Sequence, residues 1–333
     1  MIQDVKFSVE KFSGLHSYFV PKIEQIKKSN YYFDSTKTVI GDAPKNLIRI
    51  YKYSCKYHKK NKYNWPLYIA KFGHKWYPNE SITEYLLNLL GLCFGLEMAE
   101  SSLVMIKGQL RYLSKYFLKH DEELIHGADI FSAYLGDKDL VEEIENQGYA
   151  RDLFGLRFVE DSVSHLFPAY KNDIMSNLVK LLLFDALVGN NDRHFYNWGV
   201  IRSVTGNNSP RLSPIYDTAR GLFWNDSESK LMKLSCSDFK MEEYIENYCE
   251  RSKPKLGWET ETEINHYRLV ELIYKNEFYI SKSELKSLFL QNVFDDMCNV
   301  IDREMEHLMS PLRIRFIKRC LKVRFSHINE LCK

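Results

Sequence analysis

The chain has 333 residues and a formal net charge of +2, from 46 Lys plus Arg against 44 Asp plus Glu. This near balance gives no global electrostatic reason to expect direct nucleic-acid binding. Hydrophobic residues make up 45% of the chain and charged residues 27%, which is typical of a folded globular protein and not of a disordered one. We therefore expect one large domain or two packed lobes.

The cysteines and the apolar segments bear on where the chain works. Its 7 cysteines are scattered, and none forms a Cys-x-x-Cys pair, which argues against a zinc site and a disulfide framework. The N-terminus lacks the basic-then-apolar pattern of a secretory signal. The most apolar window, residues 86–98, is shorter than the roughly 20 residues of a membrane span. We expect no transmembrane segment and a reducing cytosol, with export as an effector left open.

From Phe7 to about Ser114 the chain contains short runs of Tyr, Ile and Val separated by turn residues, a pattern typical of strands. The predicted strands are residues 47–51, 67–72, 102–106 and 110–113. Lys107-Gly108 is predicted to form a tight turn between the last two.

One helix is predicted among these strands. It begins near Ser81, where Ser81 and Glu84 have the spacing of a capping box, and it ends near Gly91 or Gly95.

Residues 116–333 favour helices instead. The predicted helices are residues 129–135, 140–146, 161–166, 173–188, 260–274, 282–308 and 311–329. In the last of these, basic residues alternate with apolar ones, which predicts a packing helix with a basic outer face. A small β-rich lobe followed by a larger helical lobe predicts an α+β, two-lobed fold of the protein-kinase type, with lobes at 1–115 and 116–333.

The motif with the clearest chemistry follows the helix at residues 173–188. Gly189 supplies a C-cap, and Asp192 and Asn197 then lie on the loop, with Asp217 at the end of the next predicted hairpin. Phosphoryl transfer needs one carboxylate to orient a hydroxyl, and an amide oxygen with a second carboxylate to hold Mg²⁺. Asp192 is the predicted catalytic base, and Asn197 and Asp217 are the predicted metal ligands. The alternative is a surface hairpin with ordinary turn residues.

Two further segments fit nucleotide binding. Lys71 lies on a predicted strand and Glu84 on the next helix, so the carboxylate could hold the ammonium against the α and β phosphates. The alternative is a solvated Lys71 and a Glu84 that only caps its helix. No Gly-x-Gly-x-x-Gly motif is present, and Gly41 to Lys45 is the best candidate for a phosphate loop. A plain surface turn explains Gly41 to Lys45 equally well.

Taken together, the segment Gly189–Gly199 and the segment Leu212–Asp217 resemble the signature of the HipA-like serine/threonine kinases. Weaker similarity continues through the segments around Gly41, Lys71 and Glu84. The short region before Thr38 makes the chain more similar to compact, single-kinase-domain members.

The resemblance implies ATP and Mg²⁺ as cofactors and a protein hydroxyl as acceptor. It implies Asp192 as the base, and a hinge near Lys115 and Phe117 that would meet adenine. It also implies autophosphorylation at Thr38, with Ser35 or Thr36 as substitutes. A regulatory partner such as an antitoxin is a further implication, and a toxin, an effector and a housekeeping role stay open.

Two other functions compete with a protein kinase. A phosphoinositide kinase has a similar Asp-Arg-His-x-x-Asn loop, and Arg220, Lys230 and Lys233 could then hold inositol phosphates. A nucleotide-binding pseudokinase scaffold would share the fold without the reaction. The complete set of charged groups and the Pro-Ile-Tyr-Asp hairpin favour the protein kinase.

Overall fold

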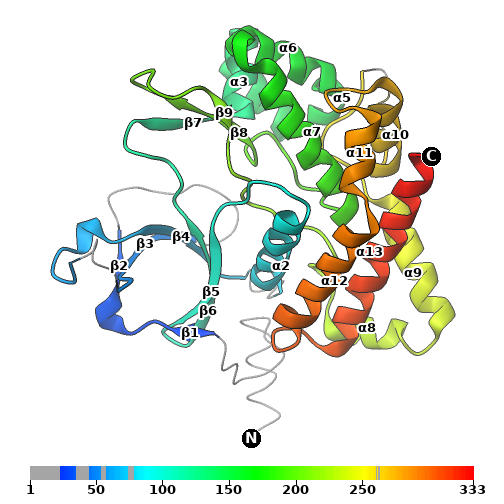
Figure 1. The fold of residues 1–333 in the computed structure, drawn as a ribbon, viewed down its shortest axis with the longest axis horizontal. Helices are drawn as coiled ribbons and strands as arrows, with labels where there is room; N and C mark the ends of the chain where they lie inside the picture. The colour runs from blue at the N-terminus through cyan, green and yellow to red at the C-terminus, as the bar shows by residue number, and fades with distance from the viewer. Residues whose placement is uncertain (1–22, 35–44, 54–57, 74–78, 260, 262) are drawn as a thin grey trace, which may run out of the picture.

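The structure is a computed structural model that describes residues 23–34, 45–53, 58–73, 79–259, 261 and 263–333. Strands gather at one end of the molecule and helices at the other, and α2 lies between them (Figure 1). The predicted α+β architecture is therefore confirmed. The lobe boundary at residue 115 stays a prediction, although β6 ends at Lys115.

Six strands form one sheet in the order β1-β5-β6-β4-β3-β2, and three form a second sheet in the order β7-β8-β9. Neighbouring strands are antiparallel except β1 and β5. Their bounds are β1 Glu24–Gln25, β2 Tyr31–Phe33, β3 Lys45–Ile50, β4 Leu67–Lys71, β5 Ser101–Ile106, β6 Gln109–Lys115, β7 Glu122–His126, β8 Gly199–Ser203 and β9 Arg211–Leu212.

The four strands predicted in the first lobe are present as β3, β4, β5 and β6. The turn predicted between β5 and β6 is also confirmed, because Lys107 and Gly108 both have positive φ, at 52° and 74°. That pair of left-handed residues matches the right-handed twist of a two-residue hairpin.

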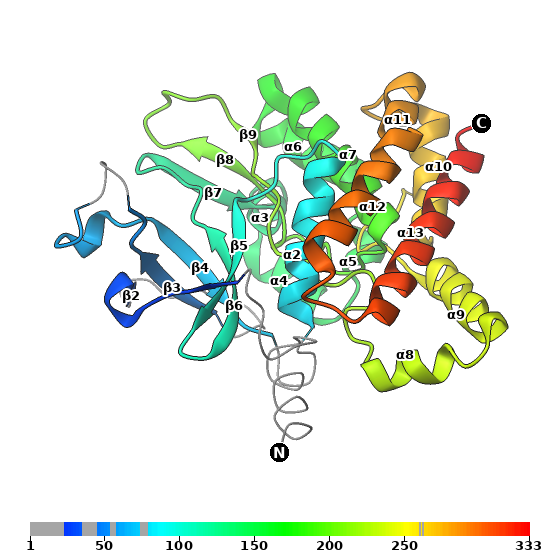
Figure 2. The same cartoon turned by 60° about the horizontal axis from the view of Figure 1, so that its bottom comes forward.

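Most helices follow β7 in the chain, and α2 lies earlier, between β4 and β5. Their bounds are α2 Glu80–Cys93, α3 Gly127–Leu135, α4 Lys138–Asn146, α5 Ala150–Leu153, α6 Leu156–Leu166, α7 Lys171–Val188, α8 Glu228–Leu234, α9 Asp238–Arg251, α10 His266–Asn276, α11 Lys282–Leu288, α12 Gln291–Met305 and α13 Pro311–Leu331. Helix α7 is buried along most of its length and lies at the centre of the helical part. Figure 2 shows α2 beside α12, so α2 joins the sheet to the helices.

Three helix predictions need correction. The capping box at Ser81 is absent: α2 begins at Glu80, and Ser81 is buried inside the first turn. The helix predicted over 282–308 is two helices, because Leu290 is extended (φ −74°, ψ 150°) and serves as the N-cap of α12. The helix predicted from residue 260 starts at His266, where the Asn265 side chain caps it.

The basic outer face predicted for the last helix is also only partly correct. Arg313 and Arg324 of α13 are 1% and 0% exposed. Arg313 pairs with Glu228 at 2.6 Å, and Arg324 donates to the carbonyl of Ala186 at 2.9 Å. These two arginines hold α13 to other parts of the helical lobe instead of facing solvent.

Across the described residues, no helix has both the length and the apolar composition needed to span a bilayer.

Candidate active site

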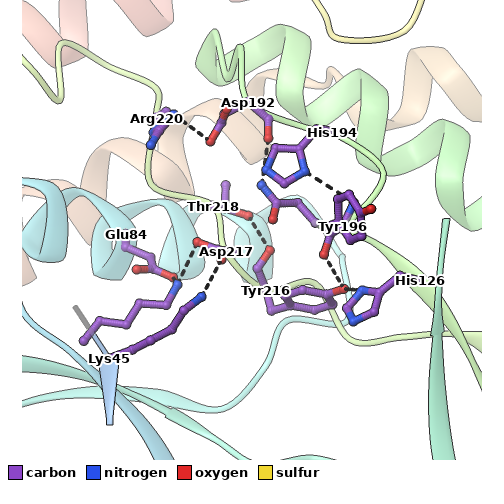
Figure 3. A network of polar contacts seen from close by, with 12 residues as sticks. Lys45, Glu84, His126, Asp192, His194, Tyr196, Tyr216, Asp217, Thr218 and Arg220 are labelled. Carbon is purple, nitrogen blue, oxygen red and sulfur yellow. Dashed lines mark hydrogen bonds and ion pairs between the residues drawn. The ribbon is translucent and has the colours of Figure 1, made fainter. Parts of the chain in front are cut away.

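A lysine between two carboxylates connects the sheet to the helical half. Lys71 lies on β4, and its ammonium is 2.6 Å from the Glu84 carboxylate and 2.8 Å from that of Asp217. Lys71 and Glu84 are 6% and 3% exposed. Glu84 therefore contacts Lys71 instead of capping its own helix. Asp217, 146 residues after Lys71, contacts the same ammonium, and Figure 3 shows Glu84, Asp217 and Lys45 around it.

Burial alone would lower the pKa of Lys71, but the charges of Glu84 and Asp217 outweigh it and raise that pKa above its ordinary value. For Asp217 the balance is the reverse: burial opposes ionisation, yet Lys71 lowers the pKa of the carboxyl to about 2. The ammonium and the Asp217 carboxylate are therefore both charged near neutral pH.

Lys45 adds a second cation on β3, where it pairs in register with Lys71. Its ammonium lies 3.9 Å from Asp217. Gly41, the other residue predicted for the phosphate loop, lies outside the described residues, as do Thr38, Ser35 and Thr36.

The loop that carries Asp192 begins where α7 ends. Gly189 caps the helix in the left-handed conformation, with φ at 66°, as predicted. A Cβ at this position would lie 2.7 Å from the buried Arg324 guanidinium. Glycine is therefore required here both by the backbone angle and by the close approach of Arg324.

The buried side chain of Arg193 holds this loop against α7. Its guanidinium pairs with Asp185 of α7 at 2.9 Å, and the two residues are 2% and 1% exposed. It also donates to the carbonyls of Asn197 and Tyr216, at 2.9 Å and 3.1 Å. One buried side chain thus links the last turns of α7 to the segments that carry Asn197 and Asp217.

His194 lies on the same loop and accepts a hydrogen bond at Nδ1 from the Tyr196 amide at 3.3 Å. This contact lies within the loop and helps to hold its shape.

Asp217 reaches the sheet through a backbone bridge between the two halves. Two residues before it, Ile215 pairs with Met98, just beyond α2. The Ile215 amide donates to the carbonyl of Glu97 at 2.8 Å, and the Ala99 amide donates to Ile215 at 2.9 Å. Asp217 itself has a φ of 53°, an uncommon conformation for a residue other than glycine. The bridge and this backbone angle direct its carboxylate toward Lys71.

Asn197 and Asp192 occupy the opposite side of the site. The Asn197 Nδ2 donates to the Asp192 carbonyl at 2.8 Å, which leaves its Oδ1 available as an acceptor. The Asp192 carboxylate, meanwhile, forms an ion pair with Arg220 at 3.2 Å. Burial raises the pKa of Asp192 above its ordinary value, against the charges of Arg220, His194 and Lys255.

The predicted hinge lies at the end of β6. The Lys115 amide donates to Glu100 at 2.8 Å, and the Tyr116 amide donates to Leu67 at 2.9 Å. The ring of Phe117 lies 5.8 Å from that of Tyr216, centroid to centroid. Lys115 and Phe117 therefore lie where the chain leaves β6 toward β7.

Sequence reasoning missed His126, and it missed the pairing of Arg220 with Asp192 and the contacts of the Tyr216 hydroxyl. The Tyr216 hydroxyl lies 3.0 Å from the Nδ1 of His126 and donates to the carbonyl of Tyr196 at 3.1 Å. These contacts depend on β7 pairing with β8, a long-range pairing that no local pattern in the sequence announces.

The side-chain oxygens of Asp217 and Asn197 suit Mg²⁺, which also binds water and substrate phosphates, better than they suit a metal held by protein groups alone. In the described part of the chain, no group of three or more His, Cys, Asp and Glu residues is arranged to hold a metal ion. Mg²⁺ usually takes one or two carboxylates and completes its shell with water and substrate phosphates. Asp217 and the free Oδ1 of Asn197 fit that requirement.

Comparison with known proteins supports a relationship to bacterial kinases. The family model described as HipA-like C-terminal domain matches residues 38–274. The serine/threonine-protein kinase CtkA of Helicobacter pylori is 26% identical over 168 residues, which is 48% of each chain. That alignment therefore spans about half the length of the curated relative.

Solved structures show the same fold over more of the chain. The crystal structure of the Helicobacter pylori proinflammatory kinase CtkA matches with a TM-score of 0.68 and 19% identity, covering 92% of this chain and 96% of the other. The HipA of Shewanella oneidensis, in complex with HipB and operator DNA, matches with a TM-score of 0.51 and 12% identity, covering 99% of this chain and 70% of the other. The chain belongs to the family of proteins with a HipA-like C-terminal domain.

Proposed function

We propose that this protein is an ATP- and Mg²⁺-dependent kinase that phosphorylates serine or threonine hydroxyls of a protein. The observation that carries the proposal is the contact of Lys71 with both Glu84 and Asp217, with Asp192 and Asn197 on the facing loop. Membership of the HipA-like family and the partial similarity to CtkA support it.

Each side chain has a role that follows from its chemistry. Lys71 binds phosphate oxygens, because its ammonium is held in position by Glu84 and keeps its proton. Asp217 and Asn197 supply oxygen ligands for the metal. Bound ATP with Mg²⁺ supplies the γ-phosphoryl group and neutralises the phosphate charge.

Asp192 orients the acceptor hydroxyl and takes up its proton. A general base works best when its pKa is close to the operating pH. Burial moves the pKa of Asp192 in that direction, upward from its ordinary value. Lys115 and Phe117 would form the side of the site that meets adenine, and Gly41 with Lys45 would cover the phosphates.

A phosphoinositide kinase is the second candidate, and the charge distribution disfavours it. Of the cations proposed to hold inositol phosphates, Lys230 is paired with Asp226 at 2.6 Å and with the Tyr244 hydroxyl at 2.7 Å. Arg220 is paired with Asp192. A polyphosphate headgroup would have to displace a carboxylate from each of these two cations, and only the third candidate, Lys233, is exposed without an ion pair among the described residues.

Autophosphorylation at Thr38, Ser35 or Thr36 and binding to an antitoxin-like partner are further parts of the proposal. The Shewanella HipA was solved with HipB, which makes a protein partner a reasonable test for this chain. A toxin, an effector and a housekeeping kinase are distinguished by the identity of the substrate.

The test is incubation with γ-labelled ATP and Mg²⁺, with the protein alone, with generic protein substrates and with phosphoinositide vesicles. Label on protein, mapped to serine or threonine, supports the proposal and also locates any autophosphorylation site. Label on lipid alone would establish the second candidate. Tight ATP binding without transfer to any acceptor would instead establish a pseudokinase scaffold.

A further inference from the structure

We propose that Arg220 and Arg251 form a subsite that binds an acidic residue of the protein substrate beside the acceptor hydroxyl. This inference rests on the proposed function and adds the substrate class to it. The two arginines lie on separate segments, one after Asp217 and one at the end of α9.

A surface depression lies directly beside the loop that carries Asp192. It has a volume of about 430 Å³, and its wall includes Asn191, the residue before Asp192. The lining residues are Asn191, Tyr244, Asn247, Tyr248, Arg251 and Ser252. It therefore lies where side chains next to an acceptor hydroxyl would reach.

The charge of this depression is positive. Arg251 is the charged residue among those that line it, and no carboxylate is among them. Arg251 is exposed, and no other described residue forms a hydrogen bond or an ion pair with its guanidinium. Two tyrosines, two asparagines and Ser252 complete the wall, a combination that can contact both the apolar stem and the carboxylate of Glu or Asp.

The segment that carries Arg220 borders the same depression through two contacts, one made by Arg220 and one by Phe223. Its carbonyl accepts from the Asn191 amide at 3.4 Å. Further along the segment, the Phe223 amide donates to the Tyr248 hydroxyl at 3.3 Å. The Arg220 guanidinium lies 5.3 Å from the centre of the Trp224 ring, which supports it from one side. The backbone of the segment that carries Arg220 thus contacts Asn191 and Tyr248, two residues of the wall of the depression.

Because Arg220 pairs with Asp192, the subsite would affect turnover as well as substrate binding. The ion pair is 3.2 Å long, and the two side chains are 32% and 19% exposed (Figure 3). In this arrangement Arg220 competes with an acceptor hydroxyl for the Asp192 carboxylate. A substrate carboxylate that attracts Arg220 would release Asp192 for the hydroxyl, so acidic substrates gain both in binding and in turnover.

A peptide fits this surface better than a membrane does. A polyphosphate headgroup needs several unpaired cations close together, whereas the depression offers Arg251 alone and the neighbouring Lys230 is neutralised by Asp226. Asn191 and Asn247 supply neutral donors and acceptors of the kind that peptide backbones use.

The test uses fluorescent peptides with one serine flanked by Glu, Ala or Lys, and the full-length protein as wild type, Arg251→Ala, Arg251→Glu and Arg220→Ala. The matched control is Lys240→Glu, an exposed position on the same helix as Arg251. Both kcat/KM for phosphoryl transfer and peptide binding by fluorescence polarisation are measured.

Wild type is expected to prefer the Glu peptide over the Ala peptide by about two- to fivefold in kcat/KM, the size of one partly exposed ion pair. Arg251→Ala and Arg220→Ala should bring that ratio close to one, Arg251→Glu should favour the Lys peptide, and Lys240→Glu should behave as wild type. A structural role alone would not change a preference for peptide charge.

Equal transfer to all three peptides by wild type would overturn the subsite and leave the kinase intact. Preferential binding of the Glu peptide, lost in Arg251→Glu but without any transfer, would support the subsite and overturn the kinase assignment. Stronger binding to phosphoinositide vesicles than to the Glu peptide, also lost in Arg251→Glu, would overturn the peptide subsite in favour of a lipid site.

Discussion

The ammonium of Lys71 lies 2.8 Å from the carboxylate of Asp217, although 146 residues separate them in the sequence. Lys71 lies on β4 and Asp217 on the segment after β9. The contact therefore joins the six-stranded sheet to the segment that follows β9. Glu84 holds the same ammonium from α2. The phosphate site that we propose at this position would depend on all three side chains.

Lys71→Met and Glu84→Gln should each reduce phosphoryl transfer, Lys71→Met by at least about 100-fold, because each removes or loosens the cation that faces the phosphates. Their effects should be strongly non-additive, since the two residues act as one unit. Steady-state kinetics of both single variants and the double variant measures this. Additive losses would contradict a shared role.

Asn197→Ala should raise the Mg²⁺ concentration needed for half-maximal transfer, because the Oδ1 that completes the metal site is lost. The matched control is Asn207→Ala, an exposed asparagine in the loop between β8 and β9. A Mg²⁺ titration of transfer rate compares the two. An unchanged Mg²⁺ requirement in Asn197→Ala would remove this residue from the metal site.

Arg193→Ala should lower the free energy of unfolding by about 3–5 kcal/mol, because it leaves the Asp185 carboxylate buried without its partner. Arg202→Ala is the control, since its ion pair with Glu123 is exposed and such pairs contribute about 1 kcal/mol or less. Urea unfolding followed by circular dichroism measures both. Equal losses in the two variants would mean that Arg193 is not the main support of the loop.

Gly189→Ala should destabilise the protein more than Gly136→Ala. Both glycines have positive φ, at 66° and 72°, so both variants incur the left-handed strain of roughly 1–2 kcal/mol. Only at Gly189 would the new Cβ also meet the Arg324 guanidinium, at 2.7 Å, because nothing lies within 4 Å of the corresponding Cβ at Gly136. Unfolding curves of Gly189→Ala and Gly136→Ala separate the effect of the Arg324 contact from that of the backbone strain. Equal losses of stability in the two variants would show that Arg324 moves away from the new Cβ at no cost.

The sequence predicted the parts of the site that have local signals. Gly189 marks the end of α7, and the spacing of Asp192 and Asn197 on a loop is readable without a structure. Lys71 and Glu84 were expected together because of their place in a strand and the next helix. The capping box was misread because Glu84 has the right spacing for a cap, while its tertiary contact with Lys71 decides where the side chain points.

Other parts depend on contacts that the sequence does not announce. Arg220 reaches Asp192 only because the segment after Asp217 turns back toward the catalytic loop. Arg313 and Arg324 read as a solvated basic face, yet each finds carbonyl acceptors in the interior. Helices α8 and α9 were not predicted, although the buried Met241, Ile245 and Cys249 of α9 have helical spacing.

The most direct test of the proposed kinase is a comparison of wild type with Asp192→Asn, a variant that keeps the shape of the side chain and removes its charge. Transfer of label from γ-labelled ATP to protein serine or threonine, with Mg²⁺, should fall by about 100- to 10,000-fold in the variant. ATP binding and the unfolding curve should stay as in wild type. Undiminished transfer in Asp192→Asn would contradict Asp192 as the base, and absence of transfer in wild type with any protein acceptor would contradict the kinase itself.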